Sequence, residues 1–177
     1  MCLYYNKNRK AEGWHVAKED IVCYKVLSVT RILDSSQETI TGFRYSTPFQ
    51  DMPVKLDETY NNTDEVNECE LATDQVRVKG GVFHSYAYLF DANREAESMS
   101  NYIIMPGGFI VVTSIIPKGT RFVMGRTNDG KVCFASRTLK ITDDVLFIQY
   151  CSVGALGKLK IEHPNAKYAG KEFWMQT

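Results

Sequence analysis

The sequence has few of the residue patterns that carry enzyme chemistry. Only three histidines occur among 177 residues, and the five cysteines include no Cys-x-x-Cys pair, which argues against a zinc ribbon and a disulfide framework. The Gly-x-x-x-x-Gly-Lys-Ser/Thr loop of phosphate-binding enzymes and the Gly-x-Ser-x-Gly elbow of serine hydrolases are both missing. We therefore expect no cofactor and no metal site, and we interpret the cysteines as small buried hydrophobic residues.

The chain also lacks a long apolar run and an excess of charge of either sign. No run approaches the ~20 residues that span a bilayer. The N-terminal residues turn polar within a few positions, unlike a signal peptide. Lys+Arg and Asp+Glu both number 21, so the formal net charge of zero gives no general attraction to nucleic acid or to anionic membranes. We predict no membrane and no nucleic-acid partner, and a cytoplasmic location.

Aromatic residues are plentiful, with 9 Phe, 10 Tyr and 2 Trp, and they suit a pleated sheet. Alternating or β-branched apolar runs predict strands at 21–33, 38–45, 75–79, 109–116, 121–124, 131–136, 138–141 and 145–151. Turn signals separate these runs, and Asn128-Asp129-Gly130 is typical of a tight hairpin. Strands joined by tight turns pair antiparallel, so the predicted fold class is α+β with a mostly antiparallel sheet.

One main helix is predicted, at about residues 86–99. Ser85 has the side chain of an N-cap, and Leu89, Ala96 and Met99 recur at the spacing of one helix face. We expect this helix to pack on the sheet and to bury that face.

We predict a single domain that carries a short arm. Residues 1–20 show no clean period and are interpreted as an N-terminal arm, whereas residues 21–177 form the α+β domain. Within the domain, residues 46–72 contain prolines and an acidic stretch without an apolar face, so an irregular acidic loop is expected there. Residues 164–174 are interpreted as a short terminal helix.

His84 follows Gly80-Gly81 and lies, by this interpretation, at the junction between a strand and the helix. As a functional residue it would combine helix-end amides with a neutral imidazole to bind an anion or orient a substrate. As a structural residue it would bond to a neighbouring backbone group, while Phe83 fills the core and Ser85 caps the helix. No matched base or metal set lies nearby in the sequence, so we favour the structural interpretation. The helix dipole would then hold the imidazole pKa below about 6.5.

Two other patterns have a possible chemical meaning. Glu68 and Glu70 stand two residues apart, which places two carboxylates on one face of an extended strand, where each shifts the pKa of the other. They belong to the acidic stretch, so we interpret them as solvated loop residues. Lys118-Gly119-Thr120 looks like the end of a phosphate loop, but it joins two predicted strands and is interpreted as a β-turn.

The order of several short blocks resembles small uncharacterised proteins of tailed phages and Bacteroidetes genomes. The blocks that carry this resemblance lie at 23–27, 46–49, 81–86, 115–122 and 135–137. The resemblance covers roughly residues 21–141, and it implies no activity.

A second resemblance is to the ADP-ribosyltransferase fold, in which an early strand with Arg or His precedes a Ser-Thr-Ser strand and a later Glu-x-Glu. Here Lys25 stands in place of the Arg, residues 45–47 match part of the second element with Pro48 in the third place, and residues 68–70 match the last. If the chain is an enzyme, its candidate catalytic residues are Lys25, Ser46, Thr47, Glu68, Glu70 and His84.

The leading hypothesis is a non-enzymatic phage-type accessory protein that binds a protein partner, either a host factor or a virion or phage component. Its location would be the host cytoplasm, or else the virion. One alternative is a divergent ADP-ribosyltransferase-like or nucleotide-binding enzyme. Another is a structural virion protein, which would self-assemble symmetrically. The sequence leaves the partner and the oligomeric state open.

Overall fold

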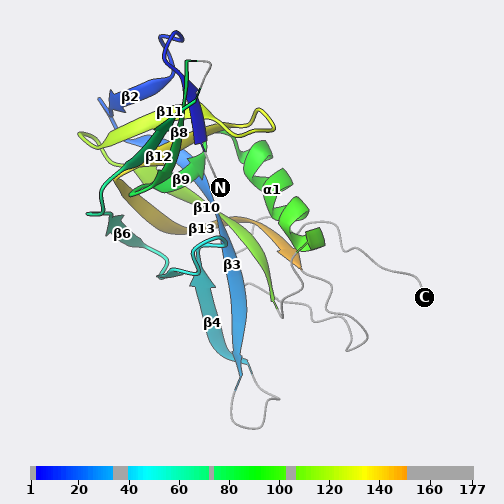
Figure 1. Ribbon diagram of the computed structural model, residues 1–177. Helices are drawn as coiled ribbons and strands as arrows, with labels where there is room; N and C mark the ends of the chain where they lie inside the picture. Colours follow the sequence, from blue (N-terminus) through cyan, green and yellow to red (C-terminus); the bar gives the residue numbers. More distant parts are fainter. Residues whose placement is uncertain (1–2, 34–39, 72–73, 103–106, 151–177) are drawn as a thin grey trace.

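The computed structural model describes residues 3–33, 40–71, 74–102 and 107–150 (Figure 1). The described elements, in chain order, are β1 (Leu3–Asn6), β2 (Gly13–Val16), β3 (Ile21–Leu33), β4 (Ile40–Ser46), β5 (Pro53–Val54), β6 (Glu58–Asn61), β7 (Asn67–Glu70), β8 (Gln75–Gly80), β9 (Phe83–Tyr86), α1 (Leu89–Tyr102), β10 (Gly107–Ile116), β11 (Arg121–Arg126), β12 (Val132–Ser136) and β13 (Thr138–Tyr150). The helix predicted at 164–174 lies outside the described residues.

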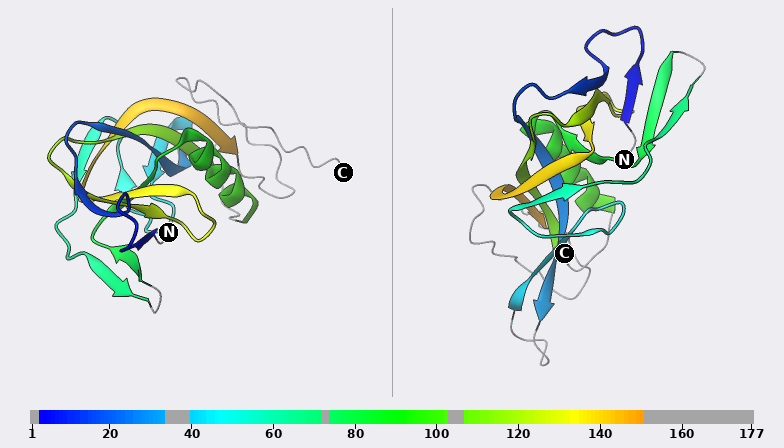
Figure 2. Two further views of the ribbon diagram at one scale, coloured as in Figure 1. Left: turned by 90° about the horizontal axis from the view of Figure 1, so that it is seen from above. Right: turned by 90° about the vertical axis from the view of Figure 1, so that its left-hand side faces the viewer.

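All the described strands belong to one antiparallel sheet, which confirms the mostly antiparallel α+β class. Along the main path the order is β6-β13-β10-β3-β9-β12-β11-β1-β8-β7. Off this path, β2 pairs with β11, while β4 pairs with β3 and β5. The β3–β4 and β7–β8 hairpins project in opposite directions from the body of the sheet (Figure 2).

The hairpins that the turn residues predicted are present. β3 pairs with β4 as expected for neighbouring strands. In the β11–β12 hairpin, the Thr127 amide donates to the Lys131 carbonyl at 2.9 Å, and Gly130 supplies a φ of 85°. The strands predicted at 138–141 and 145–151 are instead one continuous strand, β13. Register shifts against β10 allow this long strand to bend without ending.

The segment 46–72, predicted to be an irregular loop, contains three short strands. β5 pairs with β4, β6 pairs with β13, and β7 pairs with β8. Every residue of β7 is exposed, as expected for an acidic stretch. The three strands form because main-chain hydrogen bonds, to neighbouring strands for β5 and β7 and to the distant β13 for β6, satisfy the backbone without an apolar side-chain pattern.

The helix α1 begins at Leu89 and not at residue 86. The preceding residues pair with β12 as strand β9, so their backbone groups are already used in the sheet. Ser85 is therefore a buried strand residue and not an N-cap. At the true helix start, the Ala92 amide donates to the Tyr88 carbonyl at 3.2 Å.

One face of α1 packs on the sheet, against β10 and β3 (Figure 1). Ala96 and Met99 are buried there as predicted, together with Ala92. Leu89 is only partly buried, which corrects the expectation that it would lie inside the core. With 14 residues, α1 is a small element beside so large a sheet. No helix among the described residues is long and apolar enough to cross a membrane.

The central strands are buried on both faces. In β3 and β10, alternate residues enter two separate cores because successive strand side chains point to opposite faces. Val26 and Phe109 belong to the core beneath α1, whereas Leu27 and Ile110 belong to the second core. This double burial explains why the middle of β10 is a continuous apolar run.

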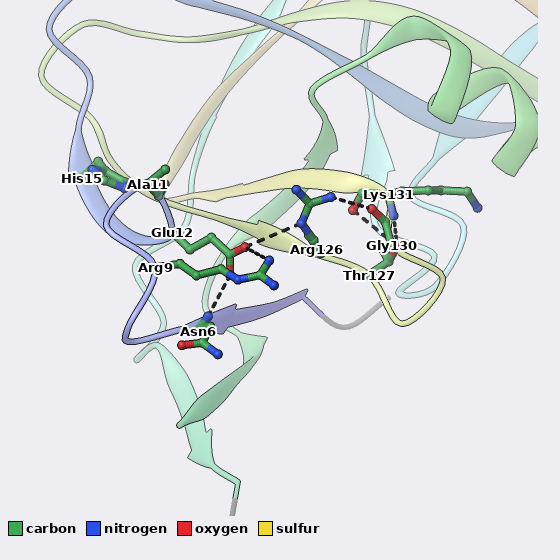
Figure 3. A network of polar contacts seen from close by, with 9 residues as sticks. All are labelled: Asn6, Arg9, Ala11, Glu12, His15, Arg126, Thr127, Gly130 and Lys131. Atoms are coloured by element: carbon green, nitrogen blue, oxygen red, sulfur yellow. Dashed lines mark hydrogen bonds and ion pairs between the residues drawn. The ribbon is translucent and has the colours of Figure 1, made fainter. Parts of the chain in front are cut away.

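The predicted N-terminal arm is bound into the sheet through β1 and β2, which both pair with β11. Glu12, in the loop between them, holds this loop in place (Figure 3). Its carboxylate accepts a hydrogen bond from the Asn6 amide at 2.8 Å and forms ion pairs with Arg9 at 3.0 Å and Arg126 at 3.6 Å. β1 and β2 therefore approach β11 at two different places along one strand.

Candidate functional site

The sheet forks beside β3. One edge of β3 pairs with β10 along residues 21–30, whereas the opposite edge is shared by two strands. β9 meets β3 at the Tyr24–Tyr86 pair, and β4 begins its pairing at the Ser28–Ser46 pair. Between these pairs, within the described sheet, residues 25–27 have no strand partner on that edge. The two strands diverge there and leave a space.

A cavity of about 240 Å³, the fork pocket, occupies this space. Its lining residues come from five parts of the fold, and those that matter most here are Lys25, Thr47, Lys79, Phe83, His84 and Met99. Two of these six are lysines, and none of the residues that line the cavity is acidic. The fork pocket is therefore a basic cavity in a chain whose overall charge is balanced.

Lys25 is buried at the fork, with 9% of its surface exposed. Its Nζ donates a hydrogen bond to the carbonyl oxygen of His84 at 2.6 Å, which is its only hydrogen bond within the described residues. Burial lowers the pKa of this ammonium to about 8, although the thiols of Cys23 and Cys133 oppose the shift. At neutral pH Lys25 is thus mostly a buried cation, and it has no carboxylate partner in the described part of the chain.

His84 lies within strand β9 and not at the start of a helix, which corrects the predicted junction. Both imidazole nitrogens are buried, and neither has a hydrogen-bond partner among the described residues. Burial lowers the pKa of the imidazole to about 3, and the Lys25 ammonium adds to this shift. The predicted direction is confirmed, but its cause is burial and a lysine, not a helix dipole. A neutral imidazole keeps one N–H donor and one acceptor, so His84 brings unused hydrogen-bonding capacity to the fork pocket.

The turn after β4 forms a fixed rim of the pocket. The Thr47 hydroxyl accepts a hydrogen bond from the Met52 amide at 3.2 Å, and the Thr47 amide donates to the Met52 carbonyl at 3.0 Å. Asp51 adopts a φ of 46° within this turn and donates its amide to the Thr47 carbonyl at 2.9 Å. These bonds hold the 47–52 turn beside the pocket, and Phe49, which is exposed, forms part of the lining.

The structure brings three of the six candidate catalytic residues together. Lys25, Thr47 and His84 all line the fork pocket. Ser46 is buried next to Thr47, but its hydroxyl lies 2.7 Å from that of Ser28 and ties β4 to β3. It therefore has a structural partner in the sheet.

Glu68 and Glu70 lie elsewhere, on β7 at the far end of the strand order from β3. Glu70 forms an exposed ion pair with Lys7. Glu68 accepts a hydrogen bond from the Trp14 indole nitrogen at 2.8 Å. The fork pocket and this carboxylate pair are separate features, so the fold does not assemble the six residues at one place.

The cysteines that the structure describes offer no activated nucleophile at the pocket. Cys23 and Cys133 are buried, as predicted, and burial raises the pKa of their thiols to about 11 and about 12. Cys69 is exposed on β7, which corrects the expectation that the cysteines are buried. Among the described residues no group of three or more His, Cys, Asp or Glu side chains is placed to hold a metal ion.

His84 and Lys25 are both candidates from the sequence, but no local pattern pairs them. Lys79 was missed altogether, because nothing in an alternating strand distinguishes one outward lysine from another. Its place in the pocket depends on how β8 leads into β9, which the Gly80-Gly81 turn decides. Gly81 has a φ of 70° and lies so close to Glu65 that a side chain would not fit. Comparison with protein-family models, with curated proteins and with solved structures found no match to this chain.

Proposed function

We propose that this protein acts by binding a partner protein, without catalysis, and that the fork pocket receives an acidic side chain of that partner. The observation that supports this most is the buried Lys25 cation beside the unpartnered imidazole of His84, in a cavity without a carboxylate. A carboxylate that enters the pocket would accept hydrogen bonds from the Lys25 ammonium and from the one N–H of neutral His84. Such charge-assisted bonds are stronger than neutral ones, and they satisfy groups that the fold leaves unsatisfied.

The size of the pocket favours one side chain over a whole small molecule. Its volume of about 240 Å³ lies below the roughly 300–1,000 Å³ of typical small-molecule sites. Val26, Phe83 and Met99 supply apolar walls that would contact the aliphatic stem of a glutamate. Lys79, on the exposed side of β8, adds a second positive charge to the lining.

The imidazole of His84 and the buried thiols are poorly suited to acid–base catalysis, whereas the pKa of Lys25, at about 8, lies near the working pH. An efficient general base has a pKa near the working pH, because it must be deprotonated yet still basic. The imidazole of His84, with a pKa lowered to about 3, is deprotonated but weakly basic. The buried thiols of Cys23 and Cys133 are protonated at neutral pH. The imidazole is therefore better suited to hydrogen bonding a ligand than to catalysis.

The test is an NMR titration with two blocked amino acids, N-acetyl-glutamate methylamide and its glutamine counterpart. Only the glutamate compound should shift the signals of the Lys25 ammonium and the His84 ring. The effect should be lost in Lys25→Met and kept in Lys10→Met, a lysine exposed on the surface. Because Lys25 deprotonates near pH 8, binding should weaken as the pH rises past that value. Equal shifts with the glutamine compound would show that the pocket does not select a carboxylate.

An ADP-ribosyltransferase-like activity is the second candidate. It is favoured by the convergence of Lys25, Thr47 and His84 on one pocket, as that resemblance implies. Incubation of the protein with nicotinamide adenine dinucleotide, followed by measurement of released nicotinamide, tests this activity directly. Release that disappears in Lys25→Met but persists in Lys10→Met would replace the binding proposal with an enzymatic one.

A phage-type origin is part of the same proposal, with a host factor or a virion component as partner. A structural virion protein differs because it would bind copies of itself. Native mass measurement at increasing protein concentration separates these cases. A closed symmetric oligomer would favour the structural role, and a monomer would favour the accessory role.

A further inference from the structure

A second hollow, larger than the fork pocket, lies between β2, β7, the turn that leads into β11 and the β12–β13 junction. Its volume is about 740 Å³, and we call it the basic cleft. Its lining includes Trp14, Val66, Glu68, Lys118, Arg121 and Arg137. Three cations and one carboxylate therefore face one cavity, in a chain whose total formal charge is zero. Its volume lies within the roughly 300–1,000 Å³ of small-molecule sites, unlike that of the fork pocket.

The backbone of the Lys118-Gly119-Thr120 turn takes no part in anion binding. Its three amides are already used, by the Asp20 carboxylate at 2.8 Å, the Ala17 carbonyl at 2.8 Å and the Pro117 carbonyl at 3.1 Å. This confirms that the segment is a β-turn and not a phosphate loop. An anion in the cleft would depend on side chains alone.

The two arginines of the cleft are already oriented. The Nε of Arg137 donates to the Asn62 carbonyl at 2.9 Å, which fixes the guanidinium plane and leaves its terminal nitrogens without a hydrogen bond in the described residues. The guanidinium of Arg121 lies over the ring of Trp14, 5.0 Å from its centroid. Neither arginine, nor Lys118, forms an ion pair with a carboxylate in the described part of the chain. Arginine presents a planar fork that matches the oxygens of a phosphate.

Glu68, beside Trp14, offers a different chemistry. One oxygen of Glu68 accepts hydrogen bonds from the Trp14 indole at 2.8 Å and the Tyr5 hydroxyl at 3.5 Å. Its other oxygen has no hydrogen bond in the described residues and can accept from sugar hydroxyls. The Trp14 ring and the Arg121 guanidinium that lies over it offer aromatic and cationic surface for a base, as in proteins that bind bases by stacking.

From this arrangement we infer that the basic cleft is a nucleotide site. The base lies against the Trp14–Arg121 pair, the phosphate binds Arg137 and Lys118, and Glu68 accepts from the ribose. A free nucleotide fits better than a nucleic acid strand, because a chain of zero net charge gives a polyanion no general attraction. The site is independent of the fork pocket and of the partner proposed for it.

The experiment is calorimetric titration of the full chain with adenosine monophosphate, and in parallel with inorganic phosphate, adenosine, a short adenylate strand and tetraglutamate. The variants are Arg137→Gln and Arg121→Lys, the second of which keeps the charge but loses the planar guanidinium. Arg94→Gln, on the exposed face of α1, is the matched control. Lys25→Met is a second control, because it disables the fork pocket and leaves the cleft intact. Thermal unfolding checks that each variant is folded.

The expected result is saturable binding of the mononucleotide that is tighter than that of phosphate or adenosine alone. Arg137→Gln and Arg121→Lys should each weaken it by about tenfold, as expected for losing charge-assisted or stacked contacts, whereas Arg94→Gln and Lys25→Met leave it unchanged. Absence of binding at millimolar nucleotide would overturn the inference. The inference would also be overturned if phosphate, tetraglutamate or the adenylate strand bound at least as tightly as adenosine monophosphate. Such a result would show that the cleft does not select a single nucleotide.

Discussion

The Lys25 ammonium donates a hydrogen bond to the carbonyl oxygen of His84 at 2.6 Å, across the point where β3 and β9 separate. Two titratable groups are thereby buried near one another, and no acidic residue lines the pocket among the residues that the structure describes. Burial lowers the pKa of both, and each positive charge would disfavour the other. Both the stability of the fold and ligand binding at the fork should therefore depend on pH. Substitutions of Lys25 and of His84 separate the contribution of each group.

Lys25→Met should be at least as stable as the wild type at neutral pH. A buried cation without a carboxylate partner costs free energy, and methionine fills a similar volume without that cost. The lowering of the pKa from 10.5 to about 8 corresponds to about 3 kcal/mol. Above pH 8 the folded wild type loses this proton while the unfolded chain still holds it, so the wild type gains stability up to about pH 10.5.

Denaturant unfolding of both proteins at several pH values measures this effect. The advantage of Lys25→Met should shrink between pH 8 and pH 10.5. The comparison must use the difference between the two proteins, because the raised pKa values of Cys23 and Cys133 make the fold less stable over the same range. A constant difference across this range would show that Lys25 is not buried as a cation.

The helix face gives a second prediction. Met99 is buried beneath α1, and Met99→Ala should lower the free energy of unfolding by about 2–5 kcal/mol. Leu89 is only partly buried at the helix start, so Leu89→Ala should cost less, about 1–2 kcal/mol. Chemical denaturation of the two variants gives the comparison, and a larger loss for Leu89→Ala would mean that the helix packs on a different face.

Local signals allowed most of the sheet to be predicted. The β3–β4 and β11–β12 hairpins were predicted correctly because their strands are neighbours in the chain and their turns carry Asn, Asp, Ser or Gly. β6 was missed because its partner is β13, near residue 140, and its own residues show no alternation. Pairing between distant segments depends on the whole fold, and a polar edge strand leaves little trace in the sequence.

The candidate site was harder to predict for the same reason. The hydrogen bond between Lys25 and His84 joins residues that are 59 positions apart. Ser85 has good N-cap chemistry, but pairing with Phe134 on β12 places it in a strand instead. Local capping is worth only about 1 kcal/mol, so the sheet hydrogen bonds and core packing of β9 outweigh it. The fork arises because β9 and β4 pair with different parts of the same edge of β3. No local sequence pattern indicates such an arrangement.

The exposed carboxylates of β7 should contribute little to stability. Glu68→Gln combined with Glu70→Gln should change the free energy of unfolding by less than about 0.5 kcal/mol, because the Glu70–Lys7 pair is solvent-exposed. Glutamine keeps an oxygen that can accept from the Trp14 indole. Thermal melting of the double variant tests this, and a large loss would show that β7 depends on these side chains for its pairing with β8.

Gly125 is a site where no side chain fits. A Cβ built there would lie 2.3 Å from the Tyr4 carbonyl oxygen, since β1 approaches β11 closely at this point. Gly125→Ala should therefore destabilise the fold by about 1–3 kcal/mol or more, through displacement of β1. Gly80→Ala is the matched control, because its Cβ would meet only ordinary contacts. Equal melting temperatures for the two variants would mean that β1 lies further from β11 than described.

His84 should make the wild type sensitive to acid. The imidazole has a pKa of about 3 when folded, against 6.5 in the unfolded chain, so the unfolded state binds a proton first as the pH falls. Its contribution is complete above about pH 6.5 and is lost progressively as the pH falls towards 3, which lowers stability by a few kcal/mol. His84→Gln keeps a donor and an acceptor but cannot titrate, so it should lose less stability than the wild type between pH 6.5 and pH 4. Carboxylates titrate in the same range in both proteins. The difference in unfolding free energy between wild type and His84→Gln, measured by denaturant unfolding at several pH values, therefore isolates the imidazole. An acidic side chain of a partner in the fork pocket would raise the pKa of His84 through its negative charge. An NMR titration of the His84 ring against pH would then show protonation at a higher pH in the complex than in the free protein.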